Sequence, residues 1–394
     1  MKISNVERIL LDVPFRERPG IHMSRRLWRW TLIEICKVTT ADGLVGHGET
    51  VVHYTWCRVN DDQVKKVIGH NPMDFLWDDS LGAGLQMALF DLVGKAMDVP
   101  CYRLMGNKVR DKCPISWWAI DMPPEDWAEE VKLAVKMGYC NAKLKARPWF
   151  DIFEQVQAVS DATPNYFKLD LDFNSLLINS GYAVPVLRDL EKFPKVSIFE
   201  TPIPQNDVLG YVTIKRRVSR PIALHYGVPS FTVSVRENVC DGFVVGGGAS
   251  RVKSQAAAAA EVNMPFWLQL VGTGLTTAFT LHLGAVLTHA LWPAITCYEI
   301  YSDDLIKDKI EVQGGYARVP DRPGLGVTID ENALEKLRVE PPAEKPEPKM
   351  KYRISWPSGI SLCFDHADDY YREFSAGNLP VFQRGVKFEA LSRS

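Results

Sequence analysis

The chain has 394 residues, of which 46% are hydrophobic and 24% are charged, and its formal net charge is -2. This composition is typical of a globular protein, and the length is enough for one large domain and a smaller one. The near-neutral charge, without a long basic run, argues against nucleic acid or an anionic membrane as a partner.

The eight cysteines are scattered without CxxC spacing, which favours reduced thiols over a disulfide framework or a zinc site. The N-terminal segment lacks an apolar core of signal-peptide length. The longest apolar region, residues 281–298, is interrupted by His282, His289 and Pro293 and is too short to span a bilayer. We therefore expect a cytoplasmic protein.

The first part of the chain, residues 1–112, has the pattern of an α+β domain. Residues 6–13 alternate like a strand, and residues 28–39 and 44–50 flank a Gly-containing turn that suits a hairpin. A helical pattern over residues 85–97 ends near Pro100.

From about Cys113 to residue 320, short apolar runs alternate with amphipathic helical patterns such as 125–136 and 253–262. The expected strands are 115–120, 141–145, 167–172, 196–200, 222–225, 242–245, 265–269 and 294–299. Such alternation predicts a (β/α)8-type barrel, whose active-site residues come from the C-terminal ends of the strands. An open doubly wound sheet would also alternate, but a Gly-rich dinucleotide fingerprint is missing after the first strand.

Polar residues stand at the ends of four consecutive expected strands. They are Lys143 and Lys145, Asp172 and Asn174, Glu200, and His225. A period of two places both lysines on one side of their strand, toward the barrel interior. Lysines and carboxylates that meet in this way would suit proton abstraction next to a carboxylate. The last of these four strands ends in a histidine, His225, where the pattern of acids would place another carboxylate.

The last part of the chain, residues 321–394, contains a linker rich in Pro, Glu and Lys at 341–350, which we expect to be extended. The residues beyond it include many aromatic side chains, too many for a disordered tail. We expect this extension to pack on its own subunit or on a neighbour.

Several motifs, in order, resemble the mandelate racemase and muconate lactonising enzyme branch of the enolase superfamily. They are Gly43-x-x-Gly46-His47-Gly48-Glu49, ALFDLVGKAMDVPCYRLMGNKVRD (Ala88–Asp111), NAKLKARP, LDLDFN, FETPIP and DRPGLGVTIDE (Asp321–Glu331). The resemblance covers the chain to about residue 340. It implies a modified TIM-like barrel of the (β/α)7β type with an N-terminal capping domain.

In that family, a Mg²⁺ ion held by three carboxylates stabilises the enediolate that forms when the substrate loses its α-proton. The resemblance implies that Lys145 is the base and Lys143 its neighbour, and that Asp172 and Glu200 are metal ligands. Asn174 would support a ligand or contact substrate, and Glu299, at the expected eighth strand, would help bind substrate or transfer a proton.

Three positions depart from the family pattern. The fifth strand ends in His225-Tyr226 instead of an acid, and imidazole binds Mn²⁺, Fe²⁺ or Zn²⁺ better than Mg²⁺. Either the metal differs, or binding is weak, or no metal binds. The sixth-strand region, DGFVVGGGASRV, lacks a second lysine, and the seventh, WLQLVGTG, lacks a histidine. One-base chemistry such as dehydration is therefore easier to support than racemisation, which needs a group on each face.

Residues of the expected capping loops are candidates for substrate recognition. They are His22 and Arg25 before the hairpin and His53 and Tyr54 after it. Arginine suits carboxylate recognition. Tyr226 is a further candidate beside His225, which would be a ligand or an acid–base group. The alternative for each is a structural role.

The leading hypothesis is a lyase or isomerase that removes the α-proton of a small carboxylate, such as an acid sugar or an amino-acid derivative. A second hypothesis is a divergent barrel that binds a ligand or serves as a scaffold, which the departures favour and the retained lysines and acids oppose. A third uses His225 for acid–base chemistry without a metal. The resemblance also implies a homo-oligomer, a dimer or an octamer.

Overall fold

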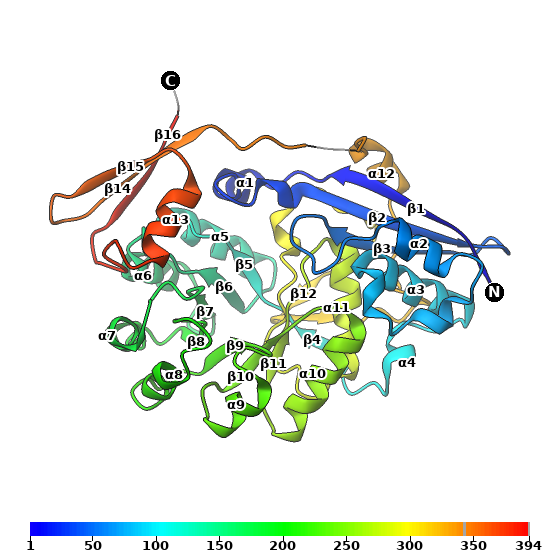
Figure 1. Cartoon of the computed structure of the whole chain (residues 1–394), viewed down its shortest axis with the longest axis horizontal. Coiled ribbons are helices and arrows are strands. Elements are labelled where there is room, and N and C mark those ends of the chain that lie inside the picture. Colours follow the sequence, from blue (N-terminus) through cyan, green and yellow to red (C-terminus); the bar gives the residue numbers. More distant parts are fainter. Residues whose placement is uncertain (342–343, 393–394) are drawn as a thin grey trace. The chain divides into compact units, whose positions relative to one another are not determined.

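The computed structural model describes residues 1–341 and 344–392 (Figure 1). These residues form two compact units. The first comprises 1–17, 29–115 and 245–345, and the second 18–28, 116–244 and 346–394. The sequence-based boundaries at 112 and 320 remain a prediction, and positions 342 and 343 of the expected linker lie outside the described residues. No helix in the described part of the chain is long and apolar enough to cross a membrane.

The first unit contains an antiparallel sheet in the order β1-β2-β3, formed by Ile3–Asp12, Leu32–Thr40 and Val45–Val51. Residues 28–31, expected to begin the second strand, form a 3-10 helix instead. Helix α3 (Ala83–Ala96) packs on β3. A Cβ atom at Gly48 would lie 2.2 Å from the carbonyl oxygen of Gly84, so only glycine permits this close approach.

The other described elements of the first unit are mostly short. They are the helices α2 (Asp61–Val67), η2 (Pro72–Phe75), η3 (Asp79–Leu81), α4 (Tyr102–Met105), α10 (Ala249–Glu261), α11 (Gly274–Val286), η4 (Tyr298–Ile300) and α12 (Glu331–Leu337), and the strands β4 (Lys112–Pro114), β11 (Phe266–Leu268), β12 (Val312–Gln313) and β13 (Tyr316–Arg318). Helix α1 (Glu17–Met23) begins at Glu17, the last residue of the 1–17 segment of the first unit, and its remaining residues belong to the second unit.

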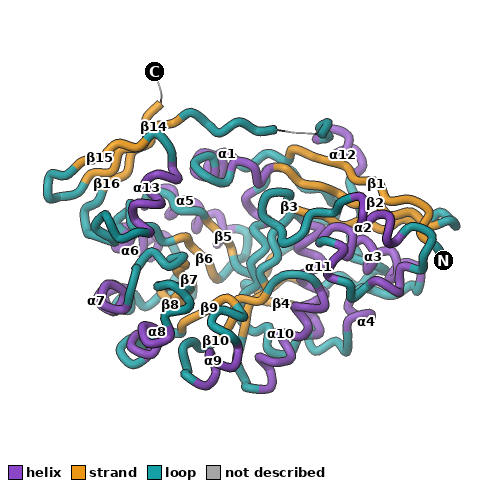
Figure 2. Tube along the Cα trace, viewed as in Figure 1, coloured by secondary structure: helices purple, strands orange, loops and turns teal. Residues whose placement is uncertain are grey.

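The central sheet has seven strands in the order β11-β10-β9-β8-β7-β6-β5 (Figure 2). Neighbouring strands from β5 to β10 pair in parallel. Its strands are β5 (Trp117–Ala119), β6 (Asn141–Lys145), β7 (Lys168–Asp172), β8 (Val196–Glu200), β9 (Ile222–His225), β10 (Gly242–Val245) and β11. The connecting helices in the second unit are α5 (Pro124–Lys136), α6 (Ile152–Ala162), α7 (Ser180–Leu190), α8 (Val208–Lys215) and α9 (Phe231–Arg236).

The eighth expected strand, 294–299, does not form as a strand. Ala294 makes a parallel bridge to Ile115, and Ile295 makes one to Gln269. Cys297 then adopts a left-handed backbone conformation with φ +54°, and a 3-10 turn follows at 298–300. The left-handed residue interrupts the extended backbone that a strand requires. The eighth position of the sheet is therefore reduced to two bridges.

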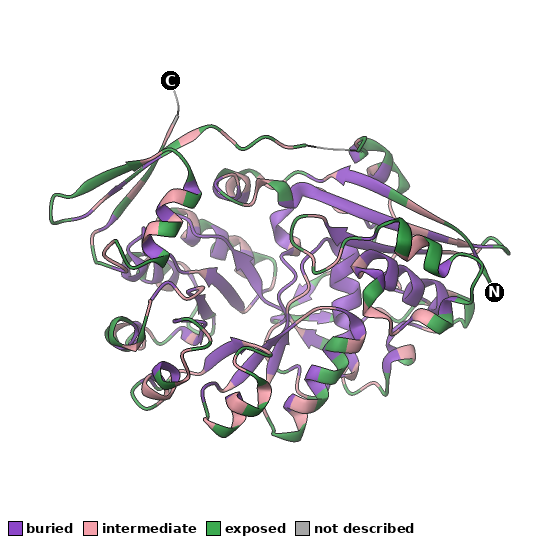
Figure 3. Ribbon diagram, in the orientation of Figure 1, coloured by how far each residue is buried: buried purple, intermediate pink, exposed green. Residues whose placement is uncertain are grey.

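The C-terminal extension belongs to the second unit. It forms a sheet in the order β15-β14-β16, from Ser361–Phe364, Met350–Ser355 and Lys387–Ser392, with helix α13 (Ala367–Ser375) between β15 and β16. Tyr352, Tyr370 and Phe374 are buried, whereas residues 357–363, at the turn of the β14–β15 hairpin and in β15, are exposed (Figure 3). The extension thus packs on its own chain by burying aromatic side chains.

Candidate active site

Strand register brings the polar strand ends together. In the parallel β6–β7 pair, Lys143 lies opposite Asp170 and Lys145 opposite Asp172. In the β7–β8 pair, Asp172 lies opposite Glu200. Because side chains two residues apart share a face of a strand, the lysine pair and the acids project from the same face of the sheet.

Two lysines and two carboxylates form a compact ion cluster. Lys143 Nζ lies 2.5 Å from Glu200 Oε2 and 3.4 Å from Asp172 Oδ2. Lys145 Nζ lies 2.5 Å from the same oxygen of Asp172. The side chains of Lys143, Asp172 and Glu200 are each 1% exposed, whereas that of Lys145 is 16% exposed. Lys145 is thus the lysine that a molecule at the strand ends can reach.

Asn174 and Arg147 extend the cluster. The ammonium group of Lys145 donates to Asn174 Oδ1 at 3.0 Å, and Arg147 donates to the same oxygen at 2.7 Å. Arg147 also donates to the main-chain carbonyl of Asp172. Sequence analysis did not single out Arg147, although it continues the period of two from Lys143 and Lys145 and could have been found by that signal.

The environment of the cluster changes the basicity of its members. Burial lowers the pKa of Lys145 from its ordinary value of 10.5, Asp172 opposes this effect, and the charges of Lys143 and Arg147 reinforce it. Burial alone would raise the pKa of Asp172, but Lys145, Lys143 and Arg147 outweigh it and hold that pKa well below its usual range. The cluster therefore holds an ionised acid beside an amine that loses its proton more readily.

A further acid, Asp170, lies two residues before Asp172 in β7 and on the same face of the strand. Its side chain accepts a hydrogen bond from the Asn141 amide at 2.9 Å, and burial raises its pKa to about 7. Asp170 is 1% exposed, so it lies beneath the cluster rather than at its mouth. We interpret it as a structural acid that helps to pack the interior.

His225 joins the cluster at one edge. Its Nε2 atom lies 3.2 Å from Glu200 Oε1, and the side chain is 40% exposed. The main-chain N–H of His225 donates to the side chain of Gln205 at 2.8 Å. The next residue, Tyr226, stacks on Phe231 with ring centroids 5.3 Å apart. An accessible imidazole can exchange a proton with a bound molecule.

The donor set only partly suits a divalent metal. Asp172 and Glu200 supply the oxygen ligands that Mg²⁺ prefers, but the third position is an imidazole. Both carboxylates already make ion pairs with lysines. Within residues 1–341 and 344–392, no three His, Cys, Asp or Glu side chains are grouped so as to hold a metal ion. A metal at these residues remains a prediction, and no step proposed below depends on it.

Two capping candidates lie in the second unit and make protein contacts. His22 Nε2 lies 2.7 Å from Asp126 Oδ2, at the start of α5. Arg25 pairs with Asp121 at 2.8 Å, and its guanidinium lies 5.1 Å from the centre of the Phe388 ring. Both side chains are buried. These contacts anchor α1 and the segment after it, and a role in substrate binding remains a prediction.

The remaining candidates lie in the first unit. The Tyr54 hydroxyl accepts a hydrogen bond from Gln269 at 3.0 Å, and its ring packs against Trp30. His53 is exposed, and partial burial, Arg29 and Arg58 lower its pKa. The carboxylate of Glu299 is buried, and its main-chain carbonyl accepts from Arg16. Their roles in the site remain predictions.

Comparison with known proteins places this architecture in a family. The model described as "Enolase C-terminal domain-like" matches residues 126–333. The chain is 26% identical over 381 residues to a D-gluconate dehydratase of Thermoproteus tenax, covering 83% of this chain and 75% of that protein.

Two solved structures share the fold. An N-succinyl Arg/Lys racemase from Bacillus cereus superposes with a TM-score of 0.70 at 20% identity, over 86% of this chain and 99% of the other. A muconate lactonizing enzyme from Pseudomonas fluorescens gives 0.71 at 20% identity, with the same coverage.

The chain therefore belongs to the enolase superfamily. Within it, the chain falls in the mandelate racemase/muconate lactonising branch, as the motifs indicated. The expected TIM-like barrel with an α+β capping domain is confirmed as the fold class. Membership also implies a divalent metal, which the donor set described above suits only in part.

Proposed function

We propose that the protein is an enzyme that removes the α-proton of a small carboxylate substrate, with Lys145 as the base. The observation that carries the proposal is the contrast within the lysine pair. Lys143 is buried and pairs with both Glu200 and Asp172. Lys145 is partly exposed, and burial and the charge of Lys143 lower its pKa. A basic amine at an accessible strand end is the group that proton abstraction needs.

The charge that develops on the substrate needs stabilisation. As the α-proton moves to Lys145 Nζ, negative charge spreads onto the carboxylate oxygens of the substrate. Lys143 and Arg147 are fixed cations beside the base, held by Glu200, Asp172 and Asn174. Preorganised positive charge in a site with little water lowers the barrier without reorganisation during the reaction.

We favour dehydration over racemisation. After the proton leaves, the C–O bond to the β-hydroxyl breaks, and the hydroxyl departs as water with a proton from His225. The resulting enol then tautomerises to a 2-keto acid. His225 suits the role of acid because its imidazole is accessible and its Nε2 atom lies 3.2 Å from Glu200 Oε1. The similarity to a D-gluconate dehydratase supports an acid sugar as the substrate class.

A bound divalent metal ion is a separate proposal from the roles of Lys145 and His225. If a divalent ion binds, Asp172 and Glu200 would be its oxygen ligands and His225 the third donor in place of its role as acid, a set that favours Mn²⁺ over Mg²⁺. A bound ion would supply Lewis-acid stabilisation of the substrate carboxylate. We also propose that the protein is a homo-oligomer, as the family resemblance implies.

A screen in D₂O tests the proposal. The wild-type protein is incubated with acid sugars and N-acyl amino acids, with and without Mg²⁺ or Mn²⁺, and mass spectrometry follows deuterium at the α-carbon. Formation of a 2-keto acid would support dehydration. Deuterium incorporation with inversion of the α-carbon and without a keto acid would indicate racemisation. Binding without either would favour the second candidate, a barrel that only binds its ligand, which the substitution of an acid by His225 favours.

A further inference from the structure

The C-terminal extension packs on the loop that follows the catalytic lysine strand. The ring of Trp149, four residues after Lys145, lies 4.8 Å from Tyr370 and 5.7 Å from Phe374, measured between centroids. Phe150 lies 5.1 Å from Phe388 on β16. Nearly all of this loop's aromatic surface is buried, since Trp149 is 1% exposed and Phe150 is 4% exposed.

A hydrogen bond fixes the end of the same loop. The main-chain N–H of Gly385 in the extension donates to Asp151 Oδ2 at 2.6 Å. The other oxygen of Asp151 caps helix α6 by accepting from the N–H groups of Phe153 and Glu154. One carboxylate therefore ties the extension to the start of α6, and the loop is held along its whole length.

The extension also reaches the loop that follows β7. Phe382 packs on Phe173 with ring centroids 5.3 Å apart, and Phe173 lies between Asp172 and Asn174. Phe382 is 3% exposed and has a backbone φ of +50°, which is uncommon for a bulky side chain. Such a conformation persists only where the surrounding structure enforces it, and it often marks a functional constraint.

The β7–α7 loop itself is strained. Asn174, Ser175 and Ile178 have positive φ values of 45°, 70° and 65°. The main-chain N–H of Ser175 donates to Thr201, and that of Leu177 donates to Pro202, so one side of the loop is held by the chain after β8. Phe382 packs on Phe173, which lies between Asp172 and Asn174.

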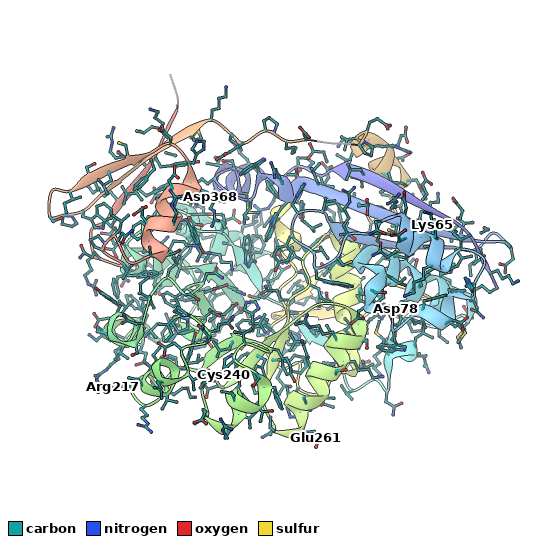
Figure 4. All side chains as sticks on the ribbon, in the orientation of Figure 1. Lys65, Asp78, Arg217, Cys240, Glu261 and Asp368 are labelled. Carbon is teal, nitrogen blue, oxygen red and sulfur yellow. The ribbon has the colours of Figure 1, made fainter. Side chains whose placement is uncertain are left out.

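A third contact links the extension to Arg147. The Arg147 guanidinium lies 6.0 Å from the centre of the Tyr371 ring, and Arg26 covers the same ring at 3.9 Å. Arg26 is held by Asp368 at 2.7 Å, at the first turn of α13 (Figure 4). Arg147 in turn donates to Asn174, the hydrogen-bond partner of Lys145.

We propose that the C-terminal extension contributes to the active site. It positions Lys145, Asp172 and Asn174 by packing on the loops that follow β6 and β7. Phe382 and Tyr371 are its main positioning residues. The matched family model ends at residue 333, so this role belongs to the part of the chain beyond it. The consequence for catalysis rests on the proposed function, whereas the consequence for loop order does not.

The test compares full-length variants by amide hydrogen exchange. Phe382→Ala should speed exchange in residues 172–178 by at least about tenfold under conditions where the rest of the protein stays folded. Tyr371→Leu should do the same, more weakly, in residues 146–151. Phe382→Leu should restore most of the protection. Leu362→Ala, at an exposed position on β15, is the control and should leave both loops unchanged.

Kinetics then separate positioning from simple stabilisation. With the carboxylate that wild type deuterates or dehydrates fastest, Phe382→Ala should lower kcat at least about tenfold while KM changes less than about threefold. Phe382→Leu should recover kcat. A merely structural contact would lower the melting temperature of Phe382→Ala and leave loop exchange and kcat as in Leu362→Ala, and that result would overturn the inference.

The two proposals fail in different ways. If wild type neither deuterates nor dehydrates any carboxylate but the loops of Phe382→Ala lose protection, the proposed function fails and the positioning of the loops stands. If wild type deuterates or dehydrates a carboxylate and Phe382→Ala is as protected and as fast as wild type, the role of the extension fails. If Phe382→Ala does not fold, Tyr371→Leu and Phe382→Leu decide by the same measurements.

Discussion

At the scale of single residues, the two lysines of β6 have different environments although they share a strand face. Lys143 contacts both carboxylates and is 1% exposed, whereas Lys145 is 16% exposed and contacts Asp172 and Asn174. The period of two predicted that they would point the same way but could not say which would be accessible. That distinction depends on depth in the barrel, which only the folded structure provides.

Substitution of His225 tests the metal. In His225→Glu, a third carboxylate would stand beside Glu200 in place of the imidazole 3.2 Å away. Because Mg²⁺ prefers oxygen ligands, we expect its affinity to rise at least about tenfold over wild type. Isothermal titration with Mg²⁺ and Mn²⁺ measures this change. His225→Gln, which adds no charge, is the control, and equal Mg²⁺ affinity in all three proteins would contradict the expectation.

At the scale of elements, the sequence predicted most strands of the central sheet to within a few residues. The miss at 294–299 has a local cause, because the left-handed conformation of Cys297 cannot be recognised from an apolar run. The packing of the extension on the loops after β6 and β7 was also beyond the sequence. Its aromatic residues indicated burial, but contacts between residues 150 and 388 or 173 and 382 depend on the tertiary fold.

The glycines of β3 make an element-scale prediction. The sequence motif marked Gly46 and Gly48, and the structure shows that α3 lies directly against them. Gly48→Ala should therefore destabilise the protein by about 1–3 kcal/mol or more through overpacking, as measured by chemical denaturation. Gly43→Asn is the control because Gly43 has φ +84° with no atom within 4 Å of a Cβ, and asparagine tolerates that conformation. Similar losses in both variants would argue against the close approach.

At the scale of the whole molecule, the resemblance to the enolase superfamily supplied more of the correct predictions than composition or periodicity did. Motifs spread from Gly43 to Glu331 predicted the fold class, the family and the meeting of Lys143, Lys145, Asp172 and Glu200. What they could not supply was the balance of charge in the site. That balance depends on the contacts that Arg147 and Asn174 make and on burial, which the motifs do not give.

Global stability should depend on acid through a buried histidine. His282 Nδ1 accepts from the Tyr102 N–H, and Nε2 donates to the Leu325 carbonyl, so the ring is neutral. Burial lowers its pKa from 6.5 to about 4. The unfolded chain binds this proton first as pH falls, so stability should decrease between pH 6.5 and pH 4, by on the order of 3 kcal/mol.

Denaturation at a series of pH values measures this loss. His282→Gln cannot gain the proton, so the stability difference between wild type and the variant should shrink as pH falls from 7 to 4. A difference that stays constant over that range would show that His282 does not titrate there. The two hydrogen bonds of His282 to main-chain groups are those of a structural residue.

The central claim is that Lys145 takes a proton from the carbon next to a carboxylate. The most direct measurement is the rate of α-proton removal by wild type, Lys145→Met and Lys168→Met with the best carboxylate from the screen, followed in D₂O as α-deuterium incorporation or as keto-acid formation. Lys168 is an exposed lysine at the opposite end of the neighbouring strand β7. The account predicts a loss of at least about a thousandfold in Lys145→Met alone. Proton removal that persists in Lys145→Met at the wild-type rate would contradict it.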